Sequence, residues 1–291
     1  MKNGLVELHT QPWAAEREWT ADGIPVLHAV ATLPRPEPVQ GGICRRIDRF
    51  YRLQSRAYLR YCERFLFPQA REECRSALAA SAPFTPTEAE LTYQVTYNEG
   101  GLWSLYTQSR EGGAPAVRRG DTWDLATGYP VALSAFFPAK SPWKRHLLAL
   151  AAGDLERRET AGVIRLREDW RRQLRRKFNP NHFYLTAEGI VLFYPVYTLS
   201  PSSIIPTIVL PYGDSLLRPG MKKPSAVWDG GRFFLYCFLS PPTHRTTMPV
   251  RAKRAMALGI TISWLNISER PHTRSLEVTV PRKMNTRAMT V

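Results

Sequence analysis

The stretch "LTYQVTYNEGGLWSLYTQSREGGAPA", residues 91–116, decides the fold class. In its first half Tyr93, Val95 and Tyr97 alternate with polar residues, which is the period of a strand with one buried face. Residues 98–101, "NEGG", tolerate positive φ, as a tight hairpin turn requires, and a second strand-like run follows them. Two strands joined by a tight turn indicate an antiparallel sheet.

The paired glycines later in this stretch bear on function. Gly112, Gly113 and Ala114 interrupt the strand pattern just before Pro115. This segment is either a plain hairpin connection or a loop that also contacts a partner. Glycine supplies backbone freedom in both cases, so the plain connection is the favoured interpretation. The three residues remain candidate partner-binding positions.

A strand and a long helix are predicted before this stretch. Residues 24–32 are apolar and favour a strand, and the prolines of residues 33–38 predict a rigid linker after it. Across residues 43–65 apolar side chains recur every three or four positions, which predicts a helix. Arginines recur on another side of that helix, at Arg45, Arg49, Arg52, Arg56, Arg60 and Arg64. The first four are candidate contacts for phosphates or an acidic wall polymer, although such faces are also common as solvated surface.

The remaining pattern completes the fold class. Residues 121–137 favour a strand, a turn and a second strand, and residues 143–157 and 163–177 have helical periodicity. A hairpin turned at Glu188 and Gly189 and a last strand at residues 204–210 follow. Strands, then helices, then strands, without βαβ alternation, predict an α+β fold with a largely antiparallel sheet packed against helices.

Charge divides the chain. The net charge is +15 over 291 residues, and residues 222–291 hold 12 Lys and Arg against three acids. We predict an N-terminal extension at residues 1–23 and an α+β domain at residues 24–221, and the charge of residues 222–291 predicts a poorly ordered basic C-terminal tail there. The tail lacks the spacing of a nucleic-acid-binding motif, which argues against nucleic acid as a partner. A frameshift product is an alternative origin for its composition.

The chain carries few signals of chemistry. It lacks the GxSxG, GxxxxGKS/T, GxGxxG and HExxH motifs, and its histidines are scattered singly. The four cysteines, Cys44, Cys62, Cys74 and Cys237, form no CxxC pair. On one helix Cys44 and Cys62 would lie roughly 27 Å apart, too far for a disulfide, so buried free thiols are expected. We predict no catalytic residue, metal or cofactor, and an enzyme is the less favoured class.

Three ordered motifs carry a family resemblance. They are Gly112-Gly113-Ala114, the run "WDLATG" at 123–128 with "LSAF" at 133–136, and "FYLT" at 183–186 with Gly189. In sequence and spacing, residues 24–217 resemble the C-terminal domain of RsiV-type anti-sigma factors and PdaC-type peptidoglycan deacetylases. Pro115 stands where that family usually has histidine, so a role that depends on the imidazole is absent or altered here.

The resemblance implies a non-catalytic recognition or sensing module of α+β fold. Its relatives belong to the cell envelope of Gram-positive bacteria, and the anti-sigma members use the region to sense lysozyme. It therefore implies a lysozyme-like protein or a cell-wall glycan as the partner. The alternative is a carbohydrate-active hydrolase of cell-wall or plant glycan, which would need two carboxylates facing each other across a cleft.

The expected compartment follows from the N-terminal residues. No apolar run is long enough to span a bilayer, and residues 1–13 lack the apolar core of a signal peptide. As written, the sequence predicts a cytoplasmic protein, whereas the resembling family is typically extracytoplasmic. A truncated N-terminus is the alternative.

Overall fold

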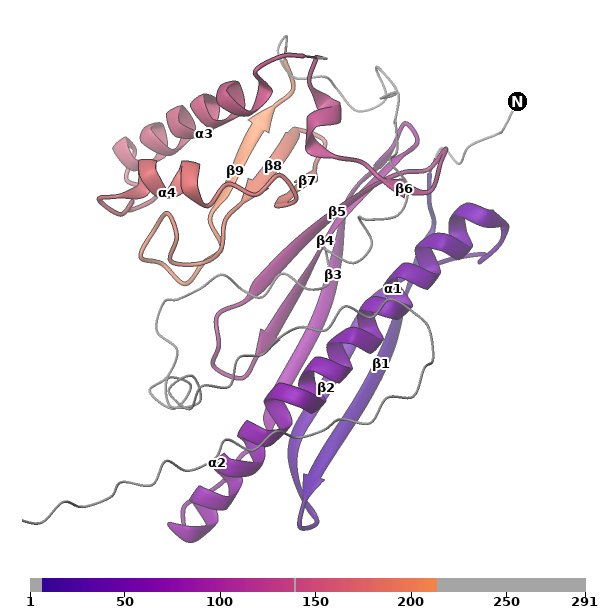
Figure 1. Ribbon diagram of the computed structural model, residues 1–291, viewed down its shortest axis with the longest axis vertical. Helices are drawn as coiled ribbons and strands as arrows, with labels where there is room; N and C mark the ends of the chain where they lie inside the picture. Colours follow the sequence, from indigo (N-terminus) through magenta and orange to yellow (C-terminus); the bar gives the residue numbers. More distant parts are fainter. Residues whose placement is uncertain (1–6, 139, 214–291) are drawn as a thin grey trace, which may run out of the picture. The chain divides into compact units, whose positions relative to one another are not determined.

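A computed structural model describes residues 7–138 and 140–213 of the chain (Figure 1). These residues form an α+β structure with mostly antiparallel sheets, which confirms the predicted fold class. A six-stranded sheet has the order β1-β2-β3-β4-β5-β6, and a three-stranded sheet has the order β7-β8-β9. The basic tail, residues 222–291, lies outside the described residues.

The six-stranded sheet is built from consecutive neighbours. Its strands are β1 Thr10–Ala21, β2 Ile24–Pro36, β3 Thr87–Glu99, β4 Leu102–Glu111, β5 Val117–Asp124 and β6 Tyr129–Pro130. Every pairing is antiparallel except that of β2 with β3, which is parallel. The predicted hairpin at residues 98–101 is confirmed, since Gly100 and Gly101 have φ of 61° and 79° between β3 and β4. Strand β1 lies within residues 1–23, the predicted extension.

The prediction of a rigid linker at residues 33–38 is wrong, because strand β2 continues to Pro36. In the register of the β1–β2 hairpin Pro34 faces Pro12. Two facing prolines fit only a non-hydrogen-bonded pair, in which backbone N–H groups point away from the partner strand. The parallel register with β3 ends at Ala31, so Pro34 interrupts no ladder on that side.

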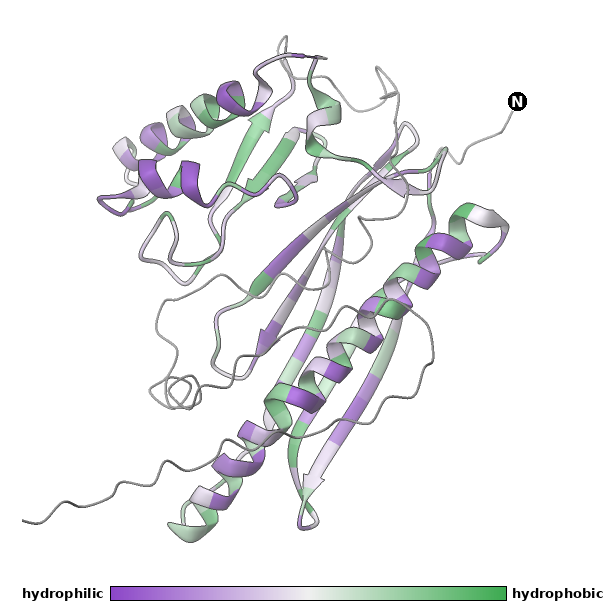
Figure 2. Cartoon of the chain, viewed as in Figure 1, coloured by the Kyte–Doolittle hydropathy of each residue, from purple (hydrophilic) through white to green (hydrophobic). Residues whose placement is uncertain are grey.

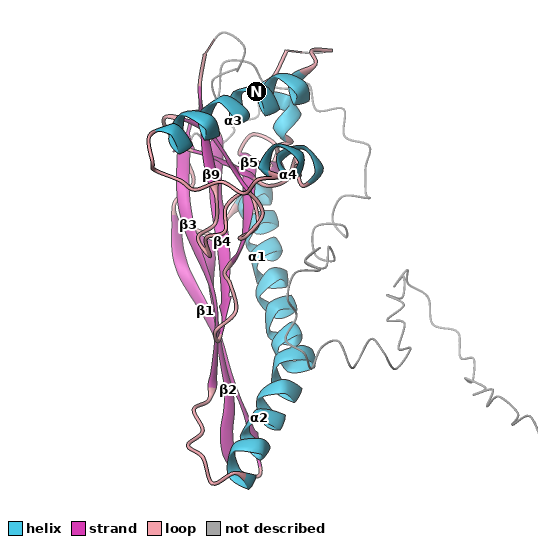
Figure 3. Ribbon diagram, turned by 90° about the vertical axis from the view of Figure 1, so that its left-hand side faces the viewer, coloured by secondary structure: helices cyan, strands magenta, loops and turns pink. Residues whose placement is uncertain are grey.

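A long helix joins the parallel strands. It comprises α1 Gly41–Tyr61, a π-helical turn Cys62–Leu66 and α2 Phe67–Ala79, without a break (Figures 1 and 3). The helix predicted at residues 43–65 is therefore confirmed. Because this helix connects β2 to the parallel β3, the chain does contain one βαβ unit, contrary to the sequence expectation.

An aromatic cluster fills the space between α1 and the sheet. Tyr51 meets Trp103 and Trp123 at ring-centroid distances of 5.9 and 6.1 Å, and Phe50 meets Trp123 edge to face at 5.0 Å. The Trp123 indole Nε1 donates a hydrogen bond of 3.0 Å to Tyr51 Oη. The apolar side of α1 therefore faces the strands, and Figure 2 shows hydrophilic residues recurring along the same helix.

The expectation of buried free thiols is confirmed for the described cysteines. Cys44, Cys62 and Cys74 are buried and unbridged along the helix. Burial raises the pKa of the Cys62 thiol to about 12, so this group is protonated at neutral pH and is a poor nucleophile. Cys237 lies outside the described residues.

Two helices and three short strands form a second cluster. They are α3 Trp143–Thr160, α4 Trp170–Arg176, β7 Phe183–Leu185, β8 Gly189–Phe193 and β9 Thr207–Pro211. The Leu185 backbone N–H donates a hydrogen bond of 2.9 Å to Ser104 Oγ of β4. Successive side chains of a strand alternate between faces, so Ser104 lies on the face of the sheet opposite Trp103 and α1. Strand β7 therefore covers the face of β4 that α1 leaves open.

The helix predicted at residues 163–177 is shorter in the structure. Only Trp170–Arg176 is helical, and Val163, at the start of the predicted helix, is 69% exposed. The backbone N–H groups before α4 find other acceptors, because Leu166 N donates to Glu159 Oε1 and Arg167 N to the Leu199 carbonyl. None of the described helices is both long enough and apolar enough to serve as a membrane span.

Candidate anion-binding groove

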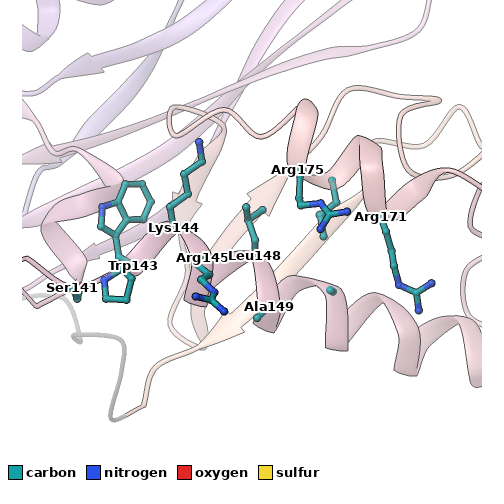
Figure 4. A pocket seen from close by; sticks show the side chains of 11 residues that line it. Ser141, Trp143, Lys144, Arg145, Leu148, Ala149, Arg171 and Arg175 are labelled. Carbon is teal, nitrogen blue, oxygen red and sulfur yellow. The ribbon is translucent and has the colours of Figure 1, made fainter.

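A groove lies between α3 and α4. Its volume is about 660 Å³, within the range of ligand pockets (Figure 4). The lining combines an apolar floor with a polar rim: Ser141, Pro142, Trp143, Lys144, Arg145, Leu148, Ala149, Ala152, Arg171, Leu174 and Arg175. Both helices therefore contribute to one site.

Helical spacing produces this division. On α3 the core side chains Leu147, Ala151 and Leu155 recur every four residues and are fully buried. Lys144, Leu148 and Ala152, at the same spacing, form the adjacent row that faces the groove. On α4 the row consists of Arg171 and Arg175, one turn apart. Two basic positions on each helix thus border one apolar floor.

The rim is positively charged and mostly uncompensated. It has four cations and no Asp or Glu among the lining residues. Arg171 forms an ion pair of 3.0 Å with Glu156, and Lys144 Nζ lies 5.2 Å from the Phe178 ring centroid. For Lys144, Arg145 and Arg175 the described part of the chain supplies no ion pair. Clustered cations beside a low-dielectric wall attract anions, so the groove favours an anionic ligand.

The lining of the groove contains no carboxylate. A glycoside hydrolase needs two carboxylates across the bound sugar, and this lining contains none. Across residues 7–138 and 140–213 no group of three or more His, Cys, Asp and Glu side chains could hold a metal ion. The geometry of this groove therefore suits recognition of a ligand.

The loop predicted from the paired glycines is the turn between β4 and β5. Gly112, Gly113 and Ala114 are exposed, and Gly112 has φ of 52°. The Gly112 N–H donates 2.8 Å to the Glu88 carbonyl of β3, and the Ala114 N–H donates 2.9 Å to the Glu111 carbonyl. A hairpin connection therefore accounts for this sequence, and a partner contact here stays a prediction.

The candidate arginines of α1 are all exposed. They are Arg45, Arg49, Arg52 and Arg56. Arg52 lies 3.6 Å from Asp48 Oδ2, and the Arg45 side chain donates to the Gly41 carbonyl at 3.3 Å. Their role in binding remains a prediction.

The structure places the glycine loop near the far end of this helix. Tyr61 Oη, at the end of α1, donates a hydrogen bond of 2.8 Å to Glu111, next to the loop. Burial raises the pKa of Glu111, which keeps its carboxyl group less acidic than usual. Arg45 lies 16 residues before Tyr61, about 24 Å along the helix axis. The loop and Arg45 therefore belong to separate surface regions.

Comparison with solved structures defines the class of fold. The chain is similar in structure to a member of the DUF3298 family from Bacteroides fragilis, with a TM-score of 0.54 and 14% identity over 75% of this chain and 96% of that chain. A DUF3298 family protein from Pseudomonas aeruginosa has a TM-score of 0.45 and 16% identity over 73% of this chain and 95% of that chain.

Identity this low supports the fold and carries no function with it. No family model and no curated protein matches the sequence. The class of protein is therefore an α+β domain with the fold of the Bacteroides fragilis protein. The resemblance to RsiV-type and PdaC-type proteins stays a prediction.

Proposed function

We propose that this chain is a non-catalytic binding or sensing module for a cell-envelope ligand or a protein partner. The observation that carries this proposal is the groove between α3 and α4, where four cations border an apolar floor without any carboxylate. Such a site attracts and orients an anion, and its lining offers no carboxylate for a reaction. The sequence resemblance supports the same class of function.

The charge of the groove selects among the partners implied by the resemblance. An anionic wall polymer or the acidic surface of a protein complements Lys144, Arg145 and Arg175. A neutral glycan or the surface of a basic protein would leave these charges unpaired. We therefore expect a lysozyme-like partner to bind here only through an acidic region.

Binding of the full-length protein tests the proposal. Immobilised anionic wall polymer, a neutral oligosaccharide of N-acetylglucosamine and lysozyme are compared as probes by surface plasmon resonance at low and high salt. Binding of at least one probe without cleavage, weakened in Arg145→Gln/Arg175→Gln but not in Arg157→Gln, is the expected result. Arg157 is an exposed residue of the same helix outside the groove lining and serves as the control. If the protein released new reducing ends from the wall polymer or from the oligosaccharide, it would instead be a hydrolase.

A further inference from the structure

We infer that the groove between α3 and α4 binds an acidic, amphipathic peptide segment of a partner protein. This inference rests on the proposed function and names the class of ligand for its site. It requires a ligand with an apolar side and several separated negative charges, and three features of the groove set these requirements.

The floor of the groove is apolar and partly open. Trp143 and Leu148 are half-buried, and Ala149 is exposed. Covering this surface removes apolar area from water, which stabilises a complex by roughly 25 cal/mol per Å² before the costs of binding. A fully hydrated polyanion cannot cover it, whereas Leu or Phe side chains of a peptide can.

The cations are distributed along the groove. Figure 4 shows Lys144 and Arg145 toward one end, Arg175 beyond Leu148, and Arg171 farther on. The α3 wall from Lys144 to Ala152 extends about 12 Å at the helical rise per residue. A lipid or phosphate monoester has one head group and would engage only part of this rim. Carboxylates spaced along a peptide can engage both helices at once.

The rim already binds a carboxylate of its own chain. Two nitrogens of Arg171, Nε and Nη2, donate to Glu156 Oε1 at 3.3 and 3.0 Å. Such charge-assisted bonds are the strong class of hydrogen bond, and the guanidinium fork matches a carboxylate. Arg175, one turn farther along α4, is exposed and has no ion pair within the described residues. An acidic side chain of a ligand can bind Arg175 in the same manner.

Charge argues against the C-terminal tail of the chain as the occupant. Residues 222–291 contain 12 Lys and Arg and three acids, so their sign matches that of the rim. Like charges brought together oppose binding. The complementary occupant is therefore a segment supplied by another protein.

The test uses the full-length protein and fluorescein-labelled synthetic peptides of about twelve residues, longer than the groove wall. The probe peptide has Glu at i and i+4 on one face and Leu and Phe on the other. In one control peptide Ser replaces the apolar residues, and in another Lys replaces Glu. Vesicles of neutral phospholipid with and without an anionic phospholipid form a separate arm. Fluorescence anisotropy measures peptide affinity, and co-sedimentation measures vesicle binding.

The probe peptide should bind more tightly than both control peptides, and higher salt should weaken it. Arg145→Gln/Arg175→Gln should weaken it about tenfold, since two charge contacts are lost. Arg157→Gln should bind as wild type, which controls for the loss of an arginine from α3. Ala149→Glu adds a carboxylate at an exposed floor position and should weaken binding without unfolding the protein, as circular dichroism would show.

Several results would overturn this inference. Equal binding by the groove variants and the Arg157→Gln control would place the peptide site elsewhere. Groove-dependent binding of anionic vesicles but not of the probe peptide would assign a lipid instead. A photo-crosslinker at position 149 that captures residues 214–291 or a second copy would identify either as the occupant. Wall polymer that binds through Arg145 and Arg175, without peptide binding, would remove this inference and leave the proposed function intact.

Discussion

Gly120 of β5 is a position where a single added methyl group should strongly destabilise the fold. A Cβ there would overlap the Phe183 carbonyl oxygen of β7, and it would lie 2.7 Å from the carbonyl carbon and 3.2 Å from the Phe193 ring. The overlapping atoms belong to backbone, so a side-chain rotation cannot relieve them. Gly120→Ala must therefore push β7 away from the six-stranded sheet.

Two effects should lower the free energy of unfolding of Gly120→Ala. Ordinary contact between carbon atoms is about 3.5–4.0 Å, so the Phe183 carbonyl carbon must retreat by about 1 Å and the overlapping oxygen by more. Overpacking of this kind costs about 1–3 kcal/mol. The same movement breaks the bond from Leu185 N–H to Ser104 Oγ, and a buried unpaired donor costs about 1–3 kcal/mol more. The expected loss is about 2–6 kcal/mol, a large part of a typical folding free energy.

Urea denaturation followed by tryptophan fluorescence and circular dichroism measures this loss. Gly113→Ala is the matched control, because nothing lies within 4 Å of its Cβ, and it should change stability by less than about 0.5 kcal/mol. Hydrogen exchange at the Leu185 amide should also accelerate in Gly120→Ala. A loss under about 1 kcal/mol, with that amide still protected, would refute the close approach of β7 to β5.

Four further outcomes are expected. Tyr51→Phe leaves the buried Trp123 indole N–H without its acceptor and should cost about 1–3 kcal/mol in urea denaturation, and no measurable change would contradict that bond. Hydrogen bonds with Glu16 and, to a lesser extent, Glu88 raise the pKa of His28 above 6.5 in the folded protein. The protonated imidazole therefore stabilises the fold fully below pH 6.5, and this stabilisation is lost as the pH rises through the raised pKa. The melting temperatures of wild type and His28→Gln should accordingly converge at alkaline pH. Burial lowers the pKa of His182 to about 4, so as the pH falls the unfolded chain is protonated at this histidine before the folded protein is. The stability of the fold should therefore decrease between pH 6.5 and pH 4. His182→Phe should reduce this decrease in melting temperatures measured at a series of pH values. Truncation after Met221 should leave the melting temperature nearly unchanged, and a large decrease would show that residues 222–291 belong to the domain.

Local turn chemistry explains which parts of the fold were predictable. Besides the β3–β4 hairpin, the turn after β5 was predicted within residues 121–137. In the structure Asp124 Oδ1 accepts from the Ala126 N–H at 2.8 Å, and Gly128 has φ of 69°. Both signals depend only on residues within a few positions of each other, so a sequence displays them directly.

The parallel seam and the groove depend on contacts that the sequence does not display. Leu27 of β2 pairs with Thr87 of β3, which lies 60 positions later. The sequence of a strand does not reveal which other strand it pairs with, or whether the pairing is parallel or antiparallel. The groove needs Arg145 and Arg175 on separate helices to meet over one floor. The four-residue spacing of Arg171 and Arg175 was visible beforehand, but any solvated helix can show it.

The parallel pairing of β2 with β3 has a consequence for how the chain folds. The turn between β1 and β2 consists of Asp22 and Gly23, whereas β2 and β3 can pair only after the whole segment between Pro36 and Thr87 has been synthesised. Bringing the ends of a long connecting segment together lowers the entropy of the chain before any stabilising contact has formed. Hairpins between neighbouring strands therefore form faster. During synthesis from the N-terminus, β1, β2 and α1 leave the ribosome before β3 does. We expect α1 to shield the apolar face of β2 from wrong partners until β3 arrives.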